Sequence, residues 1–72
     1  MIAITTIRID HDALPDQFDR SRPDAVAAAI EAALREDAIT AEASAVISHI
    51  KVELPTTQLA AGRAVLADLQ LI

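Results

Sequence analysis

Residues 46–54, VISHIKVEL, alternate between apolar and polar side chains along their length. On an extended chain, Ile50, Val52 and Leu54 fall on one face, whereas His49 falls on the other. A period of two residues predicts a strand with one apolar face and one face in water. The elements that cover the apolar face therefore decide the fold.

Two amphipathic helices are predicted, one on either side of this strand in the sequence. Residues 23–37, PDAVAAAIEAALRED, carry one apolar stripe at helical spacing, made of Val26, Ile30, Ala33 and Leu34. Ser21 and Asp24 resemble a capping box at the start of this helix. Glu31 and Arg35 lie away from the stripe and form an i,i+4 pair in the favourable order.

The second predicted helix follows Pro55, which ends the strand. It begins at Thr56 or Thr57 and runs to the C-terminus. Its seam has the spacing of one helix face and consists of Leu59, Gly62, Leu66 and Leu69.

A further strand is predicted near the N-terminus, in residues 2–9, IAITTIRI, which are rich in β-branched side chains. Ile2 and Ile4 share one face of this strand, whereas Ile7 and Ile9 share the other. This change of phase predicts a bulge, or a strand that is buried on both faces.

The predicted order is therefore β-α-β-α, in a single domain of residues 1–72. We expect a small two-layer α/β (α+β) sandwich with both helices on one face of a short sheet. The pattern leaves open whether the strands are parallel or antiparallel. Two strands make a poor sheet with two exposed edges, which a strand from a second copy or a target would complete.

The chain is short for a stable domain, because 72 residues bury only a modest share of their surface. It has no cysteine for disulfides, and no Cys/His cluster for a structural zinc. Self-association is the remaining way to add stability, so a homodimer is predicted. The predicted interface between copies is apolar and consists of Ile47, Leu69, Leu71 and Ile72.

The charge of the chain restricts its partners. A formal net charge of −5 repels nucleic acid and anionic membranes, and the six Lys and Arg residues are scattered. The sequence shows neither a basic stretch followed by a cleavable apolar stretch nor a long apolar run, so we expect no export, no membrane insertion and a cytoplasmic location. Direct binding to nucleic acid or to a membrane is not expected.

An acidic segment, residues 10–24, is the candidate partner-binding site. It is predicted to be a long loop that leads into the first helix, and such loops are uncommon unless they are functional or mobile. Phe18, the only aromatic residue, is either an apolar anchor for the partner or a plug of the core. Around it stand the candidate carboxylates Asp10, Asp12, Asp16, Asp19 and Asp24. The predicted partner is a protein with a basic surface.

Catalytic chemistry finds little support. The chain has no cysteine, no serine or threonine in a Gly-framed elbow, and no glycine-rich phosphate loop. Asp10, His11 and Asp12 could in principle bind a cation, but the spacing lacks the glycine and terminal glutamate of an EF-hand. We therefore expect no enzyme activity, no catalytic residues, no metal and no cofactor.

Small size, acidity, the lack of cysteine and the acidic residues 10–24 resemble, as a class, the inhibitors that phages make against host machinery, anti-CRISPR proteins among them. The resemblance implies an acidic surface that blocks a nucleic-acid-binding site on a basic target. One alternative is a structural or regulatory subunit that associates through its C-terminal residues. A second alternative is a small metal-dependent enzyme that uses Asp10, His11 and Asp12.

Overall fold

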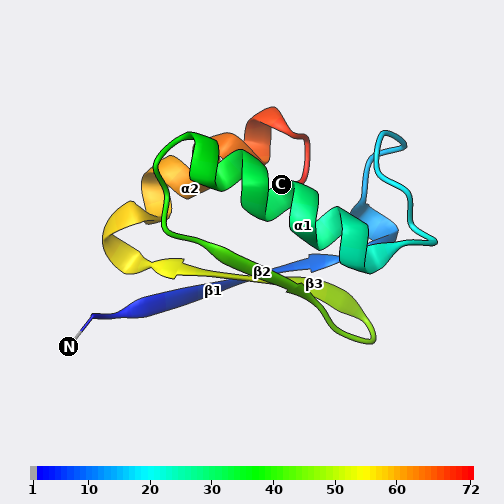
Figure 1. Ribbon diagram of the computed structural model, residues 1–72, viewed down its shortest axis with the longest axis horizontal. Helices are drawn as coiled ribbons and strands as arrows, with labels where there is room; N and C mark the ends of the chain where they lie inside the picture. The colour runs from blue at the N-terminus through cyan, green and yellow to red at the C-terminus, as the bar shows by residue number, and fades with distance from the viewer. Residues whose placement is uncertain (1) are drawn as a thin grey trace.

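The fold is mixed α+β, with a three-stranded antiparallel sheet and two helices (Figure 1). The computed structural model describes residues 2–72. The strands lie in the spatial order β1-β3-β2, so the last strand in the sequence is the central one. The elements are β1 (Ile4–Asp10), α1 (Pro23–Glu36), β2 (Glu42–Ala45), β3 (His49–Pro55) and α2 (Leu59–Asp68), with 3-10 turns at His11–Ala13 and Thr56–Gln58.

The predicted order β-α-β-α was wrong, because it lacks β2. The sequence around Glu42–Ala45 was interpreted as a polar connection, yet these residues pair antiparallel with β3. The first residues of the predicted strand form the hairpin connection instead. There the Val46 amide donates to the His49 carbonyl oxygen at 2.9 Å, and Ile47 stands fully exposed at the tip.

The predicted bulge or two-sided burial of the first strand was also wrong. Pairing of β1 with β3 is continuous, from Ile4 opposite Pro55 to Asp10 opposite His49. Ile9 is buried on the helix side of the sheet, whereas Ile4 faces the other side and is 54% exposed. The apolar residues of β1 therefore change from one face to the other because Ile4 lies on the face that no helix covers.

The core lies between the sheet and the two helices, which cover the same face of the sheet in Figure 1. The predicted alternation of β3 is confirmed, since Ile50, Val52 and Leu54 are all buried. The predicted stripe of α1 is confirmed at Val26, Ile30 and Leu34. The opposite face of the sheet carries polar and charged side chains, among them Thr6, Arg8, Lys51 and Glu53.

Both helices end in the same backbone motif without glycine. After α1, Ala38 takes a positive φ of 61° and the Ile39 amide donates to the Leu34 carbonyl oxygen at 3.1 Å. After α2, Gln70 takes a φ of 64° and the Leu71 amide donates to the Leu66 carbonyl oxygen at 2.9 Å. These are Schellman-type caps, and the second turns Leu71 back into the core.

The predicted capping box at the start of α1 was wrong. Arg22 is the N-cap residue and makes no side-chain capping bond. The Ser21 hydroxyl donates to Asp19 instead. Pro23 occupies the first turn, where its missing amide hydrogen causes no loss.

Gly62 allows α2 to pack closely on β3. A Cβ atom at this position would lie 2.5 Å from Leu54 Cδ1, which is a steric overlap. Within residues 2–72, neither helix has the length and apolar character required to cross a bilayer.

Candidate partner-binding site

The connection between β1 and α1, residues 11–22, is anchored to the core at one end of the molecule (Figure 1). Leu14 is buried, with 1% of its surface exposed. The Arg20 guanidinium donates to the Leu14 carbonyl oxygen at 2.6 Å. The side-chain amide of Gln17 donates to the Leu69 carbonyl oxygen at 3.1 Å. These contacts tie the segment to the core and to the end of α2.

The five candidate carboxylates are all exposed on this segment or at its two ends. Asp10 ends β1, Asp12 lies in the 3-10 turn, and Asp24 lies in the first turn of α1. Asp12, Asp16 and Asp24 form no hydrogen bond or ion pair with other residues of the range 2–72. Their negative charge is therefore not neutralised by direct contact within the described chain.

The other two carboxylates have partners within the chain. The Arg8 guanidinium, 2.8 Å from Asp10 Oδ1, holds the pKa of Asp10 below its usual value through a hydrogen bond and charge attraction. Hydrogen bonds from the Ser21 hydroxyl and amide lower the pKa of Asp19. Both groups are therefore ionised at neutral pH, like ordinary aspartates.

Phe18 packs partly against the core, which favours the plug over a freely exposed anchor. The exposed part of its ring lines an open hollow of about 190 Å³ between the connection and α1. The rest of this hollow is formed by Gln17, Asp19, Arg22, Ala25, Val26 and Ala29. Its lining therefore combines apolar side chains with one negative and one positive residue, Asp19 and Arg22.

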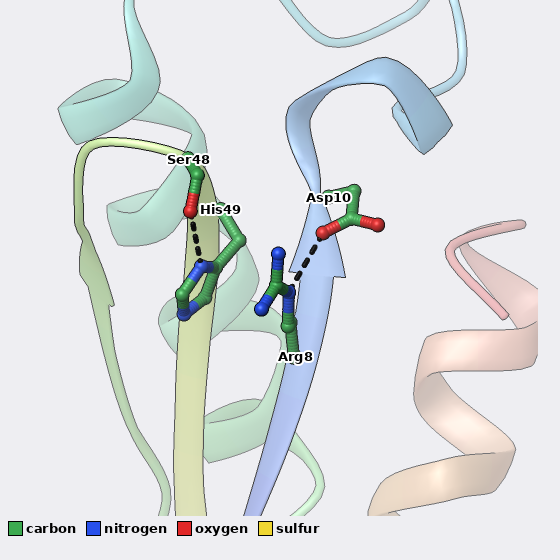
Figure 2. A network of polar contacts seen from close by, with 4 residues as sticks. All are labelled: Arg8, Asp10, Ser48 and His49. Atoms are coloured by element: carbon green, nitrogen blue, oxygen red, sulfur yellow. Dashed lines mark hydrogen bonds and ion pairs between the residues drawn. The ribbon is translucent and has the colours of Figure 1, made fainter.

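The two histidines, His11 and His49, lie in different surroundings. Within residues 2–72, no group of three or more His, Asp or Glu side chains is placed to hold a metal ion. His11 Nε2 is buried without a hydrogen-bond partner. His49 Nδ1 lies 2.9 Å from the Ser48 hydroxyl oxygen. Figure 2 shows this contact on the strand next to the Arg8–Asp10 pair.

The four residues predicted to join two copies lie in different environments. Ile47 and Ile72 are exposed, at 102% and 56%. Leu71 is buried and Leu69 packs against the core, so the fold of one chain already accounts for their apolar character. Ile72 lines an open hollow of about 550 Å³ beside α2, together with Ala60, Arg63, Ala64 and Ala67. An interface at these residues stays a prediction.

No protein-family model, curated protein or solved structure gives a significant match to this chain.

Proposed function

We propose that this chain is a non-catalytic protein-binding module, in which the acidic residues 10–24 meet a basic surface on the partner. The observation that carries the proposal is the unpaired negative charge of Asp12, Asp16 and Asp24. Residues 10–24 hold five aspartates against two arginines, Arg20 and Arg22, and of these aspartates Asp10 forms an ion pair, with Arg8. The segment therefore presents more negative than positive charge to its surroundings.

Charge and shape have separate tasks in this proposal. Exposed carboxylates at the rim of an interface accelerate encounter with a basic partner and add less to the lifetime of the complex. The hollow beside Phe18 supplies the apolar contact that slows dissociation. Because Leu14 and Arg20 already order the segment, little entropy is lost when it binds.

The finer proposal concerns the kind of partner. The basic surfaces that neutralise the phosphates of nucleic acid carry the charge that an acidic module would pair with. The class-level resemblance to phage inhibitors, and to anti-CRISPR proteins among them, supports inhibition by occupation of such a surface. On this proposal the chain competes with DNA or RNA for its target.

Charge reversal at matched positions tests the proposal. The immobilised chain is used to capture partners from an extract of the source cell, and captured proteins are identified by mass spectrometry. Asp12→Lys with Asp16→Lys should abolish capture of the specific partner, because attraction becomes repulsion. The control, Glu36→Lys with Asp68→Lys, makes the same charge change in the last turns of α1 and α2.

Each outcome bears on the proposal. Capture lost in the first variant and kept in the control supports binding through residues 10–24. Equal capture by both variants places the interface elsewhere and refutes it. With the captured partner purified, its association rate should fall as salt rises, since the screening length is about 8–10 Å in physiological buffers. Added DNA or RNA should displace the chain if the finer proposal holds.

A further inference from the structure

The outer edge of β1 carries backbone groups that nothing in the described chain pairs. The Thr56 amide donates to the Ala3 carbonyl oxygen at 2.9 Å, which fixes the phase of the β1–β3 ladder. Backbone groups alternate in direction along an antiparallel strand. Those of Thr5, Ile7 and Ile9 therefore point toward β3, and those of Ile4, Thr6, Arg8 and Asp10 point outward.

This edge also lacks the features by which edge strands usually avoid pairing. β1 is seven residues long, is regularly paired with β3, and contains neither proline nor lysine. Its two charges, Arg8 and Asp10, neutralise each other at 2.8 Å. Natural edges are commonly short, bulged, or marked by unpaired charges. The outer side of β1 is thus suited to receive another strand.

We propose that β1 pairs antiparallel with β1 of a second copy, with the two-fold axis at Ile7. Each copy contributes a three-stranded sheet, and the two join into one continuous sheet. This interface shares only Asp10 with the acidic residues 10–24 of the proposed function. It also differs from an interface through the hairpin tip or the C-terminus.

The register follows from the backbone and the side chains together. Outward-pointing residues must pair with outward-pointing residues, which leaves only a few registers. Centring the pair on Arg8 would place two arginines directly opposite each other, which is unfavourable. Centring it on Ile7 pairs Thr6 with Arg8 and Ile4 with Asp10, so no like charges are opposed and every outward residue of the strand is used.

Side chains on the helix side fit the same register. Ile7 is only partly buried within one chain, although it packs at the border of the core. At the axis it meets Ile7 of the second copy in a non-hydrogen-bonded pair, where side chains approach most closely. Thr5 and Ile9 of the two copies lie opposite each other beside this pair, and Ile9 is already buried in its own core. A small core without disulfide or metal gains stability from such an extension.

The dimer should respond to salt in the opposite direction from the acidic segment. Each copy has a formal net charge of −5, so two copies repel over distance. Screening removes this repulsion, and the pairing itself relies on backbone bonds and apolar contact. Salt therefore strengthens the dimer and weakens capture of a basic partner, so failure of one proposal is distinguishable from failure of the other.

A cysteine scan tests the position of the axis, because the natural chain has no cysteine. Under mild oxidation, Ile7→Cys should form a disulfide-linked dimer about tenfold faster than Ile47→Cys, since thiols at a non-hydrogen-bonded axial pair lie within disulfide distance. Ile47 is the more exposed residue, so it reports random collision. Equal rates, or faster cross-linking of Ile47→Cys, would overturn the proposal.

A proline substitution tests the backbone pairing. By light scattering the natural chain should have about twice its mass of 7.6 kDa. Thr6→Pro removes an outward amide and should give the mass of one chain, whereas Thr6→Ala, which keeps the amide, should not. A single-chain mass for the natural protein at high concentration, or equal masses for the two variants, contradicts the proposal. Should Thr6→Pro fail to fold by circular dichroism, the cysteine scan decides alone.

Discussion

The two outer strands of the sheet, β1 and β2, differ in how their free backbone groups are used. β2 has four residues, and its outward Ala43 amide donates to Glu31 Oε1 on α1 at 3.0 Å. Just before β2, the Ala41 carbonyl oxygen accepts a bond from Arg35 Nε at 3.3 Å. β1 has seven residues, and no side chain of the described residues bonds its outer edge. One edge is closed by a helix, and the other is open.

The difference originates in the path of the chain. α1 connects β1 to β2 and packs chiefly over β2, so its polar side chains reach only that edge. Glu31 and Arg35 form the i,i+4 pair, at 3.8 Å, and the same two side chains close the edge of β2. A solvated surface pair on a helix can therefore serve as protection for a strand.

Paired proline substitutions should break this comparison most strongly. Ala43→Pro removes the amide that Glu31 accepts, and we expect a loss of about 2–3 kcal/mol in the free energy of unfolding, because a bond to a charged group disappears. Thr6→Pro removes an outward amide without a partner within the chain, and we expect a loss of about 1 kcal/mol or less. Urea unfolding at low protein concentration measures both.

The control for this pair is alanine at position 6 and glycine at position 43, which keep the amide hydrogens. Equal losses for the two proline variants would mean that the edges do not differ in the monomer. A larger loss for Thr6→Pro would place a native hydrogen bond on the outer side of β1.

Removal of the carboxylate that closes the β2 edge should have a smaller effect. Glu31→Ala leaves the partly buried Ala43 amide without an acceptor, so we expect a loss of about 1–2 kcal/mol. Glu31→Gln keeps an acceptor oxygen and should lose less than half as much. Thermal unfolding compares the three proteins. Equal losses in the two variants would assign the effect to the ion pair with Arg35, which should contribute little at this exposed position.

The same comparison explains which strands could be predicted. β3 is central, so every second residue is buried and the alternation in its sequence is strong. β2 turns only Ala43 and Ala45 toward the helices, and alanine differs too little from its polar neighbours to indicate a strand. Val46 then extended the apparent apolar face of the predicted strand, although it lies in the hairpin connection before β3. A hydrophobic pattern predicts a strand only where large apolar side chains are buried. An edge strand whose inward side chains are alanines gives almost no such pattern.

The candidate site shows a different limit. The sequence identified the acidic residues 10–24, and the structure places all five carboxylates on the surface. The sequence could not indicate that Arg20 donates to a backbone carbonyl or that Ser21 donates to Asp19. Both hydrogen bonds depend on how the connection between β1 and α1 folds. The open edge of β1 was equally hidden. Which strand lies at an edge is set by the order of strands in the sheet. That order could not be predicted without β2, which the hydrophobic pattern did not indicate.

The smallest effect is expected for the exposed ion pair between Arg8 and Asp10, at the end of the open edge. Arg8 lowers the pKa of Asp10 from its usual value of 3.8, so the folded state holds the charged form more strongly than the unfolded chain. Asp10 therefore stabilises the fold above the usual pKa, and this contribution is lost as pH falls through the lowered one.

Asp10→Asn should leave stability at neutral pH almost unchanged, because the pair is exposed. Below about pH 4 its unfolding should depend less on pH than that of the natural chain. Arg8→Ala should flatten the acid slope in the same way, and the double variant should add nothing further. Acid unfolding followed by circular dichroism measures all four proteins, and identical slopes for Asp10→Asn and the natural chain would show that this pair does not contribute to stability in acid.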